Sequence, residues 1–238
     1  MNRPKIFIGI SLITLAVLML ELALTRLFSA TMYYHFAFMA ISLALFGSGA
    51  SGVFIYMIQK KLDEARTGQW MAFAAMLFAV STVIALYTIL SLPLLLNPRG
   101  GENYYRLVAV YAVTSLPFFF AGCAVTLAIT RLARDISRLY LFDLAGAALG
   151  CLLLIPVMNG IGAVNILLLV SVIGAAGGAL FSTATPGGKP HLVVSVLLGK
   201  LQGADYLLDA AFVCLALAGV IMILHVLVGL WRDFTRSA

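Results

Sequence analysis

A few ionisable residues interrupt the long apolar stretches of this sequence, and these are the residues that could do chemistry. Glu21 and Asp143 lie inside apolar runs, and Arg26 and His35 lie near Glu21 along the chain. A carboxylate surrounded by hydrocarbon is costly, so it marks a site for a proton, a cation or another ligand unless it is only paired structurally. These four residues are therefore the candidate substrate or ion contacts.

Each candidate also has a structural interpretation. Arg26 is close enough to the expected membrane surface to extend its guanidinium into water. Asp143 follows a basic loop, so Arg134 or Arg138 could pair with it. His35 follows two tyrosines that suit a membrane interface, and a single histidine there is commonly just hydrogen-bonded. The residue types alone leave both interpretations open.

Two histidines suggest a redox alternative. His35 and His225 are expected at comparable depths on different spans, and two axial imidazoles could hold a b-type haem. Nothing in the sequence brings the two spans together, so hydrogen-bonded histidines are the simpler interpretation. The three cysteines show no CxxC spacing. We expect no metal, no cofactor and no catalytic residues, since no nucleophile and base stand at a convincing spacing.

The elements that hold these residues must be membrane-spanning helices. Of 238 residues, 63% are hydrophobic and only 10% are charged, whereas a soluble domain has about 25% charged residues. The apolar runs are continuous over about twenty residues, which suits helices and not the alternating strands of a membrane barrel. The sequence predicts an all-α, polytopic transmembrane helix bundle with about seven spans.

Six of these spans are expected within residues 1–184, as one bundle. They cover about residues 6–28, 34–58, 70–96, 107–130, 139–156 and 164–184. Pro156 is expected to end the fifth span, because proline lacks a backbone N–H. Residues 185–204 are expected to form an interfacial or re-entrant segment, since the apolar part is too short to cross a bilayer. Residues 205–238 are expected to form a C-terminal transmembrane helix and a short tail.

Small residues recur at the i,i+4 spacing that gives a helix a smooth face for close packing. Residues 47–52 also match GxGxxG, but the run has no strand before it and no acidic residue about twenty positions later, so we do not expect nucleotide binding. The alternative is that such faces let helices slide during transport. The glycines expected to pack against neighbouring helices are Gly47, Gly49, Gly52, Gly146, Gly150, Gly174 and Gly178.

The positive charge of the chain indicates its orientation and not a nucleic-acid partner. The net charge is +6, but the basic residues are scattered between apolar runs and do not form a phosphate-binding face. With the N-terminus in the cytoplasm, ten of the fifteen Lys and Arg residues fall at the inner ends of the spans, as the positive-inside rule requires. Arg131 and Asp135 have the i,i+4 spacing of an ion pair.

Four segments between about residues 15 and 180 resemble a known family. They read ELALTRLFS, YYHFAFMAISLALFGSGASG, PFFFAG and LYLFDLAGAALGCLLLIPVMNGIGA. They resemble the N-terminal membrane region of bacterial spermidine-synthase-like membrane proteins, in which helices precede a cytosolic aminopropyltransferase-like domain with a Rossmann fold. After Thr185 only about fifty mostly hydrophobic residues follow, so we expect no such catalytic domain here. The resemblance implies a multi-pass module of the bacterial cytoplasmic membrane.

These observations predict an integral membrane subunit or anchoring module that docks a partner and is not an enzyme by itself. Its expected partners are membrane lipid and other membrane subunits or a second copy of the chain, with basic loops meeting anionic lipid. The alternative is half of a transporter for a small, polyamine-like cation, with Glu21 and Asp143 as contacts. A haem-binding redox subunit using His35 and His225 is a third hypothesis.

Overall fold

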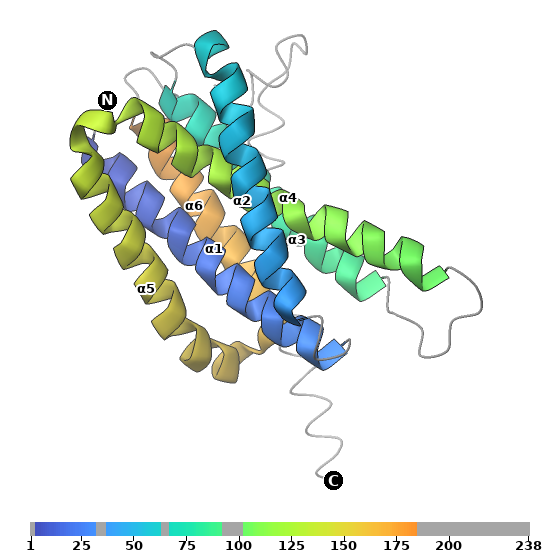
Figure 1. Cartoon of the computed structure of the whole chain (residues 1–238). Coiled ribbons are helices and arrows are strands. Elements are labelled where there is room, and N and C mark those ends of the chain that lie inside the picture. The colour runs from blue at the N-terminus through green and yellow to red at the C-terminus, as the bar shows by residue number, and fades with distance from the viewer. Residues whose placement is uncertain (1–2, 32–36, 63–66, 92–101, 185–238) are drawn as a thin grey trace, which may run out of the picture.

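The structure, a computed structural model, describes residues 3–31, 37–62, 67–91 and 102–184. This part contains no strand and is built from six long helices (Figure 1). The helices are α1 (Arg3–Thr31), α2 (Ala37–Ile58), α3 (Thr67–Ser91), α4 (Glu102–Arg131), α5 (Ile136–Ile161) and α6 (Ala163–Thr183). Two short 3-10 helices, η2 (Gln59–Lys61) and η4 (Ala133–Asp135), follow α2 and precede α5.

Each of the six helices is long and apolar enough to cross a bilayer. The chain is therefore a multi-pass membrane protein of the all-α class. The expected seventh span in residues 205–238 and the expected interfacial segment in residues 185–204 lie outside the described residues.

The sequence predicts that the fifth span ends at Pro156, and this prediction is wrong. Pro156 lies inside α5, which continues to Ile161. The helix then ends at Gly162, whose φ of 81° favours glycine and whose N–H donates to the carbonyl of Met158 at 2.9 Å. A proline removes only one backbone hydrogen bond, and membrane helices tolerate that loss because neighbouring groups compensate. The helix bows along the side of α1 (Figure 1).

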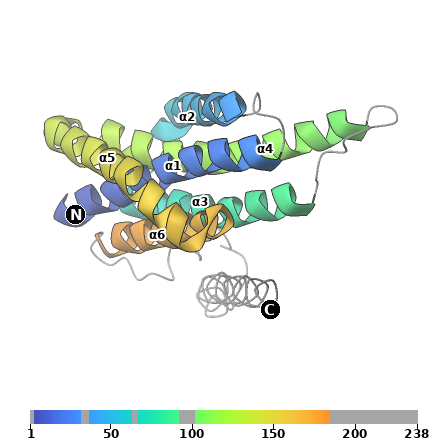
Figure 2. The same ribbon diagram turned by 90° about the horizontal axis from the view of Figure 1, so that it is seen from below.

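Helix α1 has many fully buried side chains and packs against several other helices. It packs most extensively against α5 and α6, and less extensively against α2. Helix α3 packs between α6 and α4, and α2 packs against α4 and α1. The helices α1, α6, α3, α4 and α2 therefore form a ring, and α5 lies outside it against α1 (Figure 2). The fully buried side chains of α1 include Ile10, Ile13, Leu20, Leu24 and Phe28.

Most hydroxyl side chains inside the described part of the bundle donate to backbone carbonyls, as an environment without water favours, although the buried hydroxyl of Thr114 has no partner among the described residues. Most of these bonds lie within one helix, for example from Thr82 Oγ1 to the carbonyl of Phe78 at 2.8 Å. Others join different helices. Ser171 Oγ on α6 donates to the carbonyl of Ala79 on α3 at 3.0 Å, and Thr14 Oγ1 on α1 donates to the carbonyl of Asp143 on α5 at 3.0 Å.

Candidate functional site

The carboxylate of Glu21 lies half-buried on α1. It forms no hydrogen bond or ion pair with any residue of the described part. Arg26 lies five positions further along α1 and is exposed. Five positions turn a helix by about 140°, so the two side chains point in different directions. The structure therefore does not join Glu21 and Arg26 into one site.

Asp143 is half-buried on α5, beside α1. Its backbone carbonyl accepts the hydrogen bond from Thr14, but within the described ranges its carboxylate has no polar partner. Neither Arg134 nor Arg138 pairs with it there. Glu21 is seven residues beyond Thr14 on the same helix, which corresponds to about 10 Å along the axis. The two carboxylates are therefore separate features and do not form a paired acidic site.

Gly146 and Gly150 lie where α5 approaches α1 most closely. A Cβ on Gly146 would overlap the backbone oxygen of Ser11 and come within 2.5 Å of Thr14 Oγ1. A Cβ on Gly150 would lie 2.7 Å from the carbonyl oxygen of Leu15. Both helices approach each other here because no side chain stands between their backbones, which is the arrangement that small residues permit in membranes.

Gly174 and Gly178 of α6 face α3. A Cβ on Gly174 would overlap the ring of Phe78, and one on Gly178 would lie 3.3 Å from the carbonyl oxygen of Ala72. The i,i+4 pair therefore forms a seam between these two helices, bridged by the hydrogen bond from Ser171 to Ala79.

The glycines of α2 divide into two groups. A Cβ on Gly47 would lie 2.8 Å from the carbonyl oxygen of Ser115 on α4, so this residue packs closely. A Cβ on Gly49 or Gly52 would meet nothing within 4 Å. The packing expected for these two glycines is thus not found among the described residues, because only one side of α2 faces α4.

Three further glycines are closely packed. Gly122 on α4 faces Ser51 on α2, Gly9 on α1 faces the ring of Phe181 on α6, and Gly177 on α6 faces Ile13 on α1. None of the three has a second glycine or serine four residues away, so the repeat that identifies the other glycines is missing. Only the position of the neighbouring helix reveals their role.

Charged residues tie several segments together at one end of the bundle. The guanidinium of Arg3, at the start of α1, pairs with the carboxylate of Asp135 in η4. Arg131 Nη2, at the end of α4, donates to the carbonyl of Gln59 at 2.9 Å and to that of Leu62 at 3.0 Å, which are the first residue and the C-cap of η2. Arg131 and Asp135, which the spacing suggested as partners, thus make these contacts to other segments. We call this end of the bundle, which includes Arg3, Lys60, Arg131 and Arg134, the basic end.

Removing the Arg131 guanidinium should loosen the basic end. In Arg131→Met the carbonyls of Gln59 and Leu62 lose a charged donor, and hydrogen bonds to charged groups contribute about 1.5–3 kcal/mol. We expect a clearly lower unfolding temperature in detergent, measured by intrinsic fluorescence or light scattering. Arg134→Met is the matched control, since Arg134 is exposed in the same segment. Equal unfolding temperatures for the two variants would contradict this role of Arg131.

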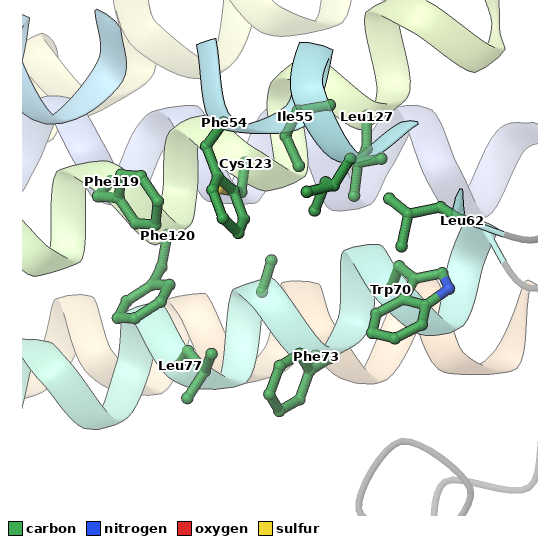
Figure 3. A pocket seen from close by; sticks show the side chains of 12 residues that line it. Phe54, Ile55, Leu62, Trp70, Phe73, Leu77, Phe119, Phe120, Cys123 and Leu127 are labelled. Carbon is green, nitrogen blue, oxygen red and sulfur yellow. The ribbon is translucent and has the colours of Figure 1, made fainter. Parts of the chain in front are cut away.

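An apolar pocket of ≈ 230 Å³ lies between α2, α3 and α4 (Figure 3). Its lining comes from the last turns of α2, the first turns of α3, the second half of α4, and Leu62. Apart from the indole of Trp70 and the buried thiol of Cys123, the lining side chains are hydrocarbons. The pocket is therefore suited to an apolar occupant.

The haem hypothesis falls on residues that the structure does not describe. His35 and His225 both lie outside the described ranges. Within those ranges, no group of three or more His, Cys, Asp or Glu residues could hold a metal ion.

Comparison of the chain with protein-family models, curated proteins and solved structures gives no match. The fold and the site define a class: a multi-pass, all-helical membrane protein with glycine seams inside and isolated carboxylates within its spans.

Proposed function

We propose that the chain is an integral membrane subunit or anchoring module, which binds a transmembrane helix of a partner protein through the outward face of α2. One observation supports this proposal above the others. Neighbouring helices pack closely against Gly47, Gly146, Gly150, Gly174 and Gly178, whereas Gly49 and Gly52, in the middle of α2, have open space beyond them.

The surroundings of Gly49 give the partner a place to insert. Leu45 and Val53 lie one helical turn to either side and are 70% and 64% exposed. The absent side chain leaves a notch between two bulky ones, into which a side chain of an adjacent helix fits. Large exposed apolar side chains by themselves suit lipid, so the notch, and not the apolarity, favours a protein partner.

The proposal is tested by filling the notch. Gly49→Leu should fold normally, because nothing lies within 4 Å of the added Cβ, but should no longer bind a partner helix. The measurement is the size of the complex in native gels after mild solubilisation, together with chemical cross-linking in intact membranes. We expect Gly49→Leu to run at the size of the single chain while the unaltered protein runs larger.

Ala148→Leu is the matched control, because Ala148 is exposed on α5 and the same bulk is added to another lipid-facing surface. If the complex remains intact in Gly49→Leu, as it should in Ala148→Leu, the docking role of α2 is refuted. The mass of the lost component distinguishes a second copy of this chain from a different subunit.

The isolated carboxylate of Glu21 supports a second candidate function, which is transport of a small cation such as a polyamine. Intramembrane carboxylates mark ion and proton pathways by default, and Glu21 has no polar partner among the described residues. In this proposal a second copy supplies the other half of the transporter.

For both functions we place the chain in the bacterial cytoplasmic membrane with its N-terminus and its basic end toward the cytoplasm. The count of basic residues at the inner ends favours this orientation. The resemblance to the membrane region of spermidine-synthase-like proteins agrees with it. In either role the chain is not an enzyme by itself.

A further inference from the structure

The pocket in Figure 3 opens between two helices that scarcely touch. Helices α2 and α3 both pack against α4 but hardly against each other, and the pocket occupies the crevice between them. The aromatic rings of Phe54, Phe119 and Phe120 stand around one part of it (Figure 3). Phe54 is 43% exposed, so this crevice lies at the outer surface of the bundle, where acyl chains surround a membrane protein.

The size and lining of the crevice select a hydrocarbon occupant. A dry apolar cavity of about 150 Å³ already binds benzene, and this pocket measures ≈ 230 Å³. Left empty, its walls would lose dispersion contacts on one side. Water would find almost no polar partner there. An acyl chain, which is abundant at this depth, would supply the missing dispersion contacts to the side chains that line the pocket.

The polar groups lie at one end of the crevice, where a lipid headgroup would be. Ile58 and Leu62 line this end, and the exposed Lys60 lies between them in sequence, next to the basic end. Trp70 lines the pocket with the carbon atoms of its ring, while its indole N–H is shielded from solvent and has no hydrogen-bond acceptor in the described part of the chain. Figure 3 shows its nitrogen on the side of Leu62. A lipid ester carbonyl would supply that acceptor once the indole turns its N–H toward the crevice.

We propose that the crevice between α2 and α3 binds one acyl chain of an anionic phospholipid. The acyl chain lies among the aromatic side chains, an ester carbonyl accepts from Trp70, and the phosphate lies near Lys60. This site is independent of the docking face of α2 that includes Gly49. It makes the lipid a specific ligand at the basic end, in addition to being the solvent of the helices.

Trp70 itself reports on the bound chain. The sequence has two tryptophans, so Trp231→Phe in the full chain leaves Trp70 as the single fluorophore. The protein is placed in phosphatidylcholine vesicles that contain a small fraction of phosphatidylglycerol with brominated acyl chains, which quench tryptophan on contact. We expect the apparent affinity for brominated phosphatidylglycerol to exceed that for brominated phosphatidylcholine roughly fivefold, as one basic residue near a lipid phosphate provides.

Two variants separate the acyl site from the headgroup site. Ala74→Phe fills the pocket from α3 and should abolish preferential quenching, while Val80→Phe, at an exposed position of the same helix, should retain it. Lys60→Gln changes an exposed side chain, so it should fold like the unaltered protein. It should make the apparent affinities for the two brominated lipids equal. Equal quenching by both lipids in the Trp231→Phe protein would overturn the proposal, and so would a phosphatidylglycerol preference that persists in Lys60→Gln.

Discussion

Gly146→Ala should destabilise the protein although alanine is the better helix former. The added Cβ would overlap the backbone oxygen of Ser11 and crowd Thr14, and neither backbone can retreat without opening the seam between α1 and α5. Overpacking of this kind costs about 1–3 kcal/mol, sometimes more, which exceeds the gain in helix propensity of about 1 kcal/mol. We expect a marked fall in the unfolding temperature in detergent and a lower yield of folded protein.

Gly49→Ala is the matched control, because it is the same substitution at a helical glycine with open space around it. Its unfolding temperature should be unchanged or slightly higher, since only the propensity gain of about 1 kcal/mol applies. The opposite signs of the two effects test the packing directly. If both variants unfold at the temperature of the unaltered protein, α5 does not approach α1 as closely as described.

Glu21→Gln should abolish cation uptake if the chain transports a small cation. The amide keeps the shape of the side chain but loses the negative charge that a cation or proton requires within the span. Uptake of radiolabelled spermidine into vesicles containing the purified full chain is the measurement. We expect the variant to fall to the level of protein-free vesicles while its yield and unfolding temperature stay unchanged.

Asp135→Asn is the control for this experiment, because it removes a carboxylate that pairs with Arg3 at the basic end and does not lie deep in a span. It should leave uptake intact. Uptake that persists in Glu21→Gln removes the transport proposal, and a failure of the unaltered protein to transport spermidine removes this substrate class. Neither result affects the docking proposal, which is tested on α2.

The pattern of apolar runs in the sequence was sufficient to predict an all-helical membrane protein and the positions of the six helices that the structure describes. The length and continuity of an apolar run are local properties, and a bilayer demands about twenty such residues for each crossing. For that reason the first six expected spans correspond to α1 through α6, with Pro156 as the clearest error. A proline in the sequence indicates that one backbone hydrogen bond is lost. Whether neighbouring groups compensate for that loss depends on the packing around the helix and not on the local sequence.

Which small and charged residues have neighbours depends on the tertiary structure and cannot be read from the spacing of residues. Gly47 and Gly49 share one glycine-rich run, yet one packs against α4 and the other faces outward, because the positions of helices around α4 determine which side of α2 is covered. Likewise, Arg3 and Asp135 are 132 residues apart and pair only because the fold brings the start of α1 to η4. Spacing along a chain describes one helix at a time, whereas a packing partner depends on long-range helix order.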